Sequence, residues 1–285
     1  MIELGAARYG KAGVRLMRVD RSTTPHRVRD LTIAIALEGD FVAAHTDGDN
    51  ANVVATDTMK NTAYAFAKTH LDGSIEAYAL ALAGHFVAFP QVSRATVNVR
   101  EHAWRTIAVG GTAAPDAFVR SGEGTRVATV TAAEGTSHSG VSVESGVEDL
   151  IVLKTTRSSF SGFPRDEYTT LPDTDDRMAA TKLTAIWTYG SPDVDAEVSF
   201  EAIRADLLET WADHESPSIQ TSIWIVAKAI LERHDEVREI RMVLPNLHHW
   251  LVDLTPFGLT NDREIYTPTS EPYGLIEATV RRGDG

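Results

Sequence analysis

The chain has 285 residues, with 27 Lys and Arg against 40 Asp and Glu, which gives a formal net charge of −13. It contains no cysteine, which excludes disulfides, thiolate nucleophiles, and Cys-ligated zinc or iron–sulfur clusters. The acidic balance argues against nucleic-acid binding, which requires clustered Lys and Arg, and no apolar run is long enough for a membrane span. Because no export or organelle signal is recognisable, we expect a cytoplasmic protein.

The first half of the chain predicts strands that flank two helices. Alternating apolar residues indicate strands, and apolar residues three or four apart indicate helices. In chain order we predict strands around residues 14–19 and 31–37, helices over Thr58–His70 and Ser74–Phe89 with Gly73 between them, a strand over Val92–Ile107, a turn at Gly110, Gly111 and Pro115, and a strand over Phe118–Thr131.

The second half repeats this order of elements. We predict strands over Val141–Thr156 and Thr181–Tyr189, helices around residues 200–211 and 223–231, and strands over Val237–Leu244 and Gly274–Arg281. The pattern is therefore β-β-α-α-β-β, twice, with a midpoint near residues 135–140. It predicts an α+β protein of two tandem units, residues 1–136 and 137–285, each with an antiparallel sheet and helices on one face.

One segment, Ser158–Arg177, has no period. It contains two prolines, a glycine and many acidic residues. Long irregular segments in compact domains are often functional, and the alternative is an ordinary exposed loop.

Two short motifs near the N-terminus resemble ligand-binding loops only in part. Gly5–Ala12 approaches the phosphate-binding loop G-x-x-x-x-G-K-[ST], but Ala12 replaces the hydroxyl residue and a strand pattern follows in place of a helix. Asp47–Thr58 begins like a calcium loop but lacks its glycine and its final Glu. We reject both interpretations.

The end of the second motif predicts a short strand, Val53–Val54, that runs into a helix. Thr56, Asp57 or Thr58 would be a natural N-cap of that helix. Alternatively, the turn presents Thr56 and free backbone N–H groups to a ligand.

A histidine pair and three scattered residues are the remaining candidates. His248 and His249 are poor joint metal ligands, because adjacent side chains of a strand point to opposite faces. One of them could relay a proton, and otherwise they are surface or core histidines. Phe160, Arg177 and Gln220 offer an aromatic face, a guanidinium and an amide, which together suit a flat anionic heterocycle.

These segments together resemble the urate oxidase (uricase) family. The resemblance follows the order of the chain and spans nearly all of it. It rests on Tyr9-Gly10-Lys11 with Val14-Arg15, on the blocks VVATDTMKNT (53–62), SSFSGF (158–163), DEYTTL (166–171) and Asp176-Arg177, and on Pro217-Ser218-Ile219-Gln220 and Pro245-Asn246-Leu247-His248.

The resemblance implies two tandem tunnelling-fold (T-fold) units, a homotetramer, and active sites at the interfaces between subunits. It implies oxidation of urate by O₂ to 5-hydroxyisourate and H₂O₂, with no metal and no organic cofactor. The family's site residues correspond here to a proton relay of Lys11, Thr56 and His248, with Lys11 and Thr56 supplied by the neighbouring subunit, and to urate-binding groups at Thr56, Asp57, Phe160, Leu171, Arg177, Ile219, Gln220 and Asn246.

Within that set, Arg177 and Gln220 would hold the edge of urate, Phe160 would stack on its face, and Asn246 would orient O₂ or water. Backbone groups of Asp57 and Ile219 would bind other ring atoms, and Leu171 would line the pocket. Strand alternation lets one of His248 and His249 face the pocket, and the spacing from Asn246 favours His248.

Two alternatives to this function are a purine-binding T-fold protein without activity and another purine- or pterin-handling T-fold enzyme. The zinc-dependent enzymes of that group need Cys and His ligands, which the absence of Cys disfavours.

Overall fold

The computed structural model of the chain describes residues 2–135 and 140–283 and divides into two compact units. Unit 1 comprises the described residues of Met1–Gly146 together with Trp187–Glu201, and unit 2 comprises Val147–Ile186 and Ala202–Gly285 as far as they are described. Residues 136 and 137, on either side of the predicted boundary, both lie outside the described residues, so this boundary stays a prediction.

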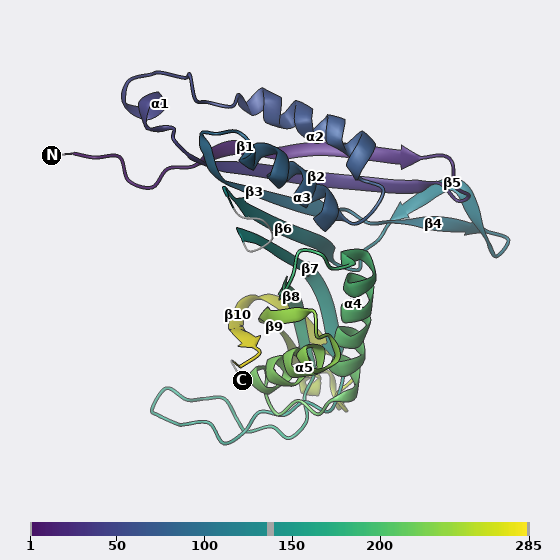
Figure 1. The fold of residues 1–285 in the computed structure, drawn as a ribbon. Helices are drawn as coiled ribbons and strands as arrows, with labels where there is room; N and C mark the ends of the chain where they lie inside the picture. Colours follow the sequence, from purple (N-terminus) through teal and green to yellow (C-terminus); the bar gives the residue numbers. More distant parts are fainter. Residues whose placement is uncertain (1, 136–139, 284–285) are drawn as a thin grey trace. The chain divides into compact units, whose positions relative to one another are not determined.

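Unit 1 places two helices on one face of an antiparallel sheet (Figure 1). Strands β1, β2, β3 and β6 pair in that order, and β7 lies beside β6. The elements are β1 (Tyr9–Asp20), β2 (Arg27–Gly39), α1 (Val42–Thr46), α2 (Thr56–His70), α3 (Ile75–Val87), β3 (Val92–Glu101), β4 (Trp104–Val109), β5 (Thr112–Arg120) and β6 (Thr125–Ala133).

The strand β2 shows why the sequence folds this way. Leu31, Ile33, Ile35 and Leu37 alternate along it, and each is at most 2% exposed. A strand places every second side chain on the same face, so these four residues form one apolar surface. The helix α3 covers the neighbouring strands with an almost wholly buried side.

Several predicted boundaries in the first half are wrong. The predicted strand Val92–Ile107 is two strands, since β3 ends at Glu101 and β4 begins at Trp104. The predicted strand Phe118–Thr131 is likewise divided between β5 and β6. Pro115 lies inside β5, in a two-stranded β4–β5 hairpin in which β5 has a free edge that needs no proline N–H. Val53 and Val54 form no strand.

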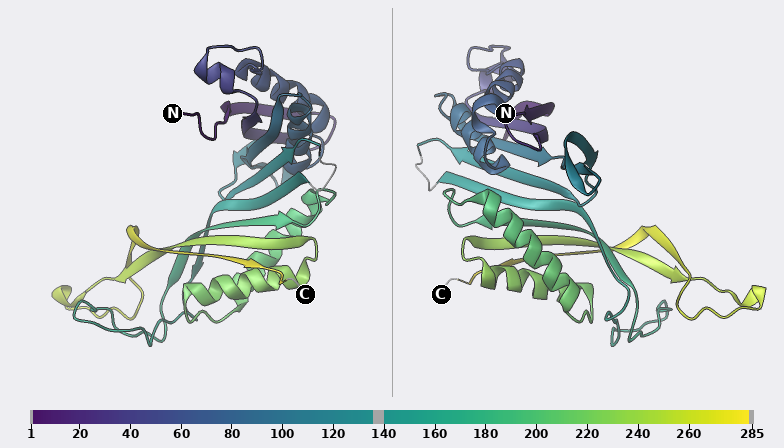
Figure 2. Two further views of the ribbon diagram at one scale, coloured as in Figure 1. Left: turned by 60° about the vertical axis from the view of Figure 1, so that its left-hand side comes forward. Right: turned by 90° about the vertical axis from the view of Figure 1, so that its right-hand side faces the viewer.

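Unit 2 has the predicted order β-β-α-α-β-β (Figure 2). Its strands follow the order β7-β8-β9-β10, and α5 packs on β9 and β10. The elements are β7 (Val141–Lys154), β8 (Ala179–Tyr189), α4 (Ala196–Asp213), α5 (Ile219–Arg233), β9 (Val237–Leu251), the short 3₁₀ helix η2 (Thr255–Phe257) and β10 (Tyr266–Arg281). Strands β9 and β10 are both longer than predicted, and β7, β8 and α4 contribute residues to both units.

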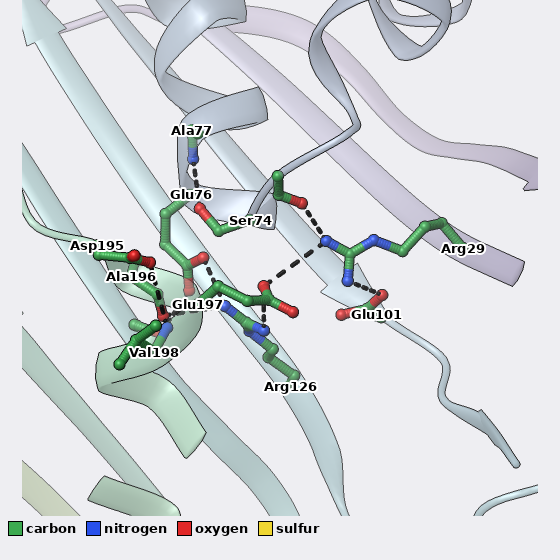
Figure 3. Close-up of polar contacts among 12 residues, drawn as sticks. Arg29, Ser74, Glu76, Ala77, Glu101, Arg126, Asp195, Ala196, Glu197 and Val198 are labelled. Atoms are coloured by element: carbon green, nitrogen blue, oxygen red, sulfur yellow. Dashed lines mark hydrogen bonds and ion pairs between the residues drawn. The ribbon is translucent and has the colours of Figure 1, made fainter. Parts of the chain in front are cut away.

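Charged groups are buried together in unit 1 (Figure 3). Glu76, at the start of α3, accepts hydrogen bonds from Arg126 at 2.9 Å and from the Ser145 hydroxyl at 2.5 Å. Arg126 also donates to Glu197 at 2.8 Å, and its guanidinium lies over the Phe200 ring at 4.2 Å. Because each buried charge has a partner of opposite sign, the network fixes the first turns of α3 and α4 on the sheet without an isolated charge.

A second buried carboxylate attaches the β4–β5 hairpin to the sheet. Asp30 of β2 is 3% exposed. It accepts hydrogen bonds from Trp104 Nε1 at 3.1 Å and from Arg120 Nη1 at 2.8 Å, and it pairs with Arg15. Burial acts to raise the pKa of Asp30, but the hydrogen bonds from Trp104 and Arg120 and the charge of Arg15 outweigh burial and lower it.

Replacing Asp30 with Asn is expected to lower the free energy of unfolding at pH 7 by about 2 kcal/mol, because Trp104, Arg120 and Arg15 lose a buried, charged acceptor. A carboxyl whose pKa is lowered by folding stabilises the protein above its ordinary pKa of 3.8, and this contribution disappears as the pH falls through the folded value. The difference between wild type and variant should therefore shrink below about pH 4. Urea unfolding at a series of pH values measures this difference in the free energy of unfolding. Asp116→Asn, on the exposed part of the same hairpin, is the control. A difference that did not depend on pH would contradict this account.

None of the described helices is both long and apolar enough to cross a membrane.

Candidate active site

Unit 2 contains a cavity of about 780 Å³. Its lining comes from segments that are far apart in the sequence, namely residues 155–178, the first turn of α5, the end of β9, and β10 with the connection before it. Figure 2 shows the segment 155–178 and the β9–β10 connection at the same end of this unit. All the site residues predicted from the second half of the chain line this one cavity: Phe160, Leu171, Arg177, Ile219, Gln220, Asn246 and His248.

The segment 155–178 is irregular, as predicted, but its base is closed by backbone hydrogen bonds. Phe160 and Thr174 exchange two of them, at 2.8 and 3.0 Å, and the Arg177 N–H donates to the Ser158 carbonyl at 2.7 Å. These bonds bring the two ends of the segment together, so Phe160 and Arg177 become neighbours although 17 positions separate them in the sequence.

Aromatic and cationic groups meet at this base. The ring of Phe160 stacks on Phe163 with a centroid separation of 5.0 Å and an interplanar angle of 11°. The guanidinium carbon of Arg177 lies 5.3 Å from the centroid of Phe160. At the far end of the segment, Arg165 donates to the Leu171 carbonyl at 3.1 Å and so helps to place Leu171.

Arg177 is a half-buried cation without an acidic partner among the described residues. Its Nε atom is buried and has no hydrogen-bond acceptor within the described chain, and burial lowers the pKa of its guanidinium. Its neighbour Asp176 does not neutralise it, because that carboxylate accepts from the Thr156 hydroxyl at 2.8 Å and from the Arg157 N–H at 3.0 Å. A desolvated guanidinium that faces a cavity is a natural anion-binding group.

The first turn of α5 brings an amide to the cavity. Ser218 is the N-cap, and its hydroxyl accepts from the Thr221 N–H at 3.1 Å. The next residue, Ile219, is 2% exposed, whereas Gln220 is exposed and lines the cavity. The first N–H groups of a helix have no partner inside it, so Ile219 and Gln220 can offer both N–H groups and an amide to a ligand.

The end of β9 supplies further polar groups. Asn246 and His248 line the cavity, and no side-chain hydrogen bond of either is found within the described residues. The ring of His248 stacks on Trp250 at 5.2 Å. His249 also lines the cavity, with its Nδ1 atom 3.2 Å from the Leu247 carbonyl oxygen, so the assignment of His248 to the relay stays a prediction.

The remaining candidates, Lys11, Thr56 and Asp57, lie in unit 1. Lys11 is half-buried on β1, where a bulge shifts the pairing with β2 between Lys11 and Val14. Glycines flank it. A Cβ atom on Gly10 would be 1.8 Å from the Ile35 carbonyl oxygen, and Gly13 has a φ of +69°. The sequence GKAG is therefore needed for this bulge, which sets the direction of Lys11.

Thr56 is the first residue of α2, and the N-cap is Ala55, with no side-chain capping bond. The prediction that Thr56, Asp57 or Thr58 is the N-cap is therefore wrong, and the Thr56 hydroxyl is not used for capping. The Asp57 carboxylate bonds to Lys60 and to Asn61 within the helix. The pKa of Asp57 is lowered mainly by Lys60, with a smaller contribution from the charge of Lys11 on β1, the strand against which α2 packs.

Tyr9, whose role no sequence motif marks, holds β1 and the start of α2 together. The hydroxyl of Tyr9 accepts from the Val54 N–H at 2.8 Å and donates to the Val54 carbonyl at 3.1 Å, and its ring contacts Phe41 edge-on at 4.7 Å. Tyr9 thus fixes the residues just before Thr56 against the strand of Lys11. The only signal in the sequence was that Tyr9 adjoins Gly10-Lys11.

A second residue that was not predicted is Arg263, on the β9–β10 connection. It lines the cavity and lies 3.4 Å from Asp176. The side chain of Asn261 positions this connection, because it donates to the Val252 and Ile265 carbonyls at 2.9 and 2.8 Å. No periodic pattern marks Arg263 in the sequence.

Over residues 2–135 and 140–283, no group of three or more His, Asp or Glu side chains could share a metal ion.

Comparison with known proteins gives one consistent family. The sequence model of the family described as Uricase matches residues 7–131 and 143–277. The chain is 43% identical to uricase of Arthrobacter globiformis over 284 residues, covering 99% of this chain and 90% of the relative. It is 38% identical to uricase of Dictyostelium discoideum over 279 residues, covering 96% of each.

Comparison with solved structures gives the same family as the sequence comparisons. The crystal structure of uricase from Arthrobacter globiformis is similar with a TM-score of 0.93 at 41% identity, covering 100% of this chain and 96% of that one. Urate oxidase from Bacillus sp. TB-90 is similar with a TM-score of 0.82 at 26% identity, covering 97% and 100%. The predicted α+β T-fold architecture is confirmed by this similarity together with the two matched segments. The chain belongs to the uricase family.

Proposed function

We propose that this protein is a cofactor-independent urate oxidase, which converts urate, O₂ and water to 5-hydroxyisourate and H₂O₂. The observation that carries this proposal is the half-buried guanidinium of Arg177, which has no acidic partner among the described residues and lies beside an aromatic ring in a cavity with both polar and apolar walls. The family supports the same reaction, since curated relatives in bacteria, amoebae and fungi are uricases.

The cavity residues suit a flat purine anion. Arg177 and Gln220 hold the edge of urate through a guanidinium and an amide, and Phe160 stacks on its face. Backbone groups of Asp57 and Ile219 bind other ring atoms, and Leu171 closes the apolar part of the pocket. A planar anion bound in this way loses water from its edge and from the face against Phe160, which strengthens its charged hydrogen bonds.

The chemistry needs a proton acceptor and an ordered oxidant. A relay of Lys11, Thr56 and His248 removes a proton from bound urate, and Asn246 orients O₂ and water above the ring. Two electrons pass from the urate dianion to O₂, which leaves as H₂O₂ after taking up two protons. Water then adds to the oxidised ring carbon, and its oxygen becomes the new hydroxyl group. Because urate itself supplies both electrons, the residues need only bind, orient and move protons.

The relay requires two copies of the chain. Lys11 and Thr56 come from unit 1 of one subunit, and the cavity comes from unit 2 of its neighbour in a homotetramer. Exposed strand edges and apolar residues support such an assembly. Strand β1 pairs with β2 alone and β10 pairs with β9 alone among the described strands. Large apolar side chains are exposed near β10, including Trp250 at 55%, Tyr273 at 48% and Leu275 at 60%.

The direct test follows the absorbance of urate in the ultraviolet, with O₂ uptake and H₂O₂ formation measured in parallel. Protein treated with a chelator and then dialysed should turn over at the rate of untreated protein. Binding of xanthine without oxidation of urate would indicate a purine-binding protein. Loss of activity on chelation, restored by zinc, would indicate a metal-dependent enzyme. Either result contradicts the proposal.

A cytoplasmic location is also part of the proposal. The complete absence of cysteine fits a reducing compartment.

A further inference from the structure

A buried chain of hydrogen bonds lies at the start of α5. His214 Nε2 is 2.8 Å from the Ser222 hydroxyl, which is 2.7 Å from the Ser216 hydroxyl. All three residues are buried, with exposures of 9%, 0% and 2% respectively. None of them is among the described residues that line the cavity.

The proton positions in this chain follow from its partners. His214 Nδ1 is 2.9 Å from the Thr210 carbonyl of α4, which can only accept, so Nδ1 carries the hydrogen. His214 Nε2 then accepts from Ser222 at 2.8 Å, a shorter contact than that from the Ser222 hydroxyl to the Ser218 carbonyl at 3.2 Å. The Ser222 oxygen accepts in turn from Ser216 at 2.7 Å, which is closer than the Ser218 carbonyl at 3.4 Å. Burial lowers the pKa of His214, and the charge of Lys154 acts in the same direction, so the ring is neutral at physiological pH.

The chain connects the elements that form the cavity. Ser222 belongs to the turn of α5 that follows Ile219 and Gln220. Ser216 bonds through its backbone to the base of the segment 155–178, because its N–H donates to the Arg157 carbonyl at 2.9 Å and its carbonyl accepts from the Ser159 N–H at 2.8 Å. The next backbone bond runs from the Arg177 N–H to the Ser158 carbonyl. The Ser222–Ser216 bond thus joins the turn of Gln220 to the base that holds Phe160 and Arg177.

We infer that His214, Ser222 and Ser216 are positioning residues of the urate site, which hold Gln220 in register with Phe160 and Arg177. This inference rests on the proposed function for the identity of the ligand. Hydrophobic attraction between the two elements is non-directional, whereas each hydrogen bond of the chain requires a defined distance and angle, so the three side chains further restrict how the elements can be placed. Substrate must contact groups from both elements at once, so a small shift between them weakens binding.

Ser222→Ala tests this inference with the smallest change. It removes one hydroxyl from the chain and places a good helix former in α5. We expect the dissociation constant of xanthine and the KM for urate to rise about 10-fold, with kcat changed less than about 3-fold. In hydrogen exchange followed by mass spectrometry, peptides covering 157–177 should exchange faster, while those covering residues 202–209 of α4 should not.

His214 variants separate positioning from simple packing. His214→Phe keeps a ring and loses both polar contacts, so it should weaken xanthine binding as Ser222→Ala does. His214→Gln can still place an amide near Ser222 and should restore most of the affinity. His234→Phe is the matched control, because His234 is 8% exposed and bonds to Asp206 of α4 at 2.7 Å, away from the cavity. It should leave xanthine binding unchanged.

Two results would overturn the inference. One is unchanged xanthine affinity in Ser222→Ala and His214→Phe, and the other is an equal loss of affinity in His234→Phe. If wild-type protein neither oxidised urate nor bound xanthine, the proposed function would fail. The exchange of peptides 157–177 in Ser222→Ala would then decide the inference alone, because that readout needs no ligand.

Discussion

Replacing Arg177 with Gln is expected to raise the dissociation constant of xanthine about 100-fold, or about 3 kcal/mol, because a charged, bidentate contact to the anion is lost. The variant should not unfold more easily than wild type. In the free protein the guanidinium is half-buried and has no carboxylate partner among the described residues, so its removal relieves a desolvation cost. Isothermal titration with xanthine and thermal unfolding of the same samples give both quantities.

A cation at the rim of the same cavity serves as control. Arg263 is 60% exposed in its side chain and is paired with Asp176, so solvent screens its charge. Arg263→Gln should change xanthine affinity less than about 3-fold. If Arg177→Gln bound xanthine as tightly as wild type, or if it lost stability and affinity together, Arg177 would be a structural residue and the site would lie elsewhere.

Replacing Lys11 with Met is expected to lower kcat about 1000-fold, or about 4 kcal/mol, and to change xanthine binding less than about 3-fold. Lys11 and Thr56 are half-buried, and their polar ends have no hydrogen-bond partner within the described residues, so neither is needed to hold the local fold. A group that acts on a proton in the reaction lowers the barrier without contributing to ground-state binding. Steady-state kinetics with urate and titration with xanthine separate the two effects.

Lys68, exposed in the last turn of α2, provides the matched control. Lys68→Met should retain wild-type kcat. Equal losses of turnover and xanthine affinity in Lys11→Met would assign Lys11 to binding, and retention of full activity would exclude it from the relay.

The elements that the sequence predicts well are those with a buried, periodic face. The alternation of Leu31, Ile33, Ile35 and Leu37 and the helical spacing of Ile223, Val226 and Ile230 both correspond to residues that are at most 2% exposed. By contrast, α1 has no buried residue, so it leaves no periodic signal. The β4–β5 hairpin was read as parts of two longer strands, because its attachment depends on Asp30, distant in sequence, and not on alternation.

The candidate site was predictable as a set of residues but not as an arrangement. Phe160, Gln220 and Asn246 converge only because the segment 155–178 closes on itself and because β9 extends past Pro245. The local spacing of apolar residues predicts neither the closure of this segment nor the extension of β9. The groups that support the site, such as Tyr9 and His214, are each recognisable only by a partner that lies beside them in the fold but is not their neighbour in the sequence.

We propose that one urate site takes Lys11 from one chain and Arg177 from another. To test this, the two impaired variants Lys11→Met and Arg177→Gln are co-expressed in equal amounts and assayed at a urate concentration far below the KM of Arg177→Gln. Each site in a mixed assembly is intact when its Lys11 comes from an Arg177→Gln chain and its Arg177 from a Lys11→Met chain. Random assembly should therefore restore about a quarter of wild-type urate oxidation per site. Activity no higher than that of either variant alone would contradict the shared site.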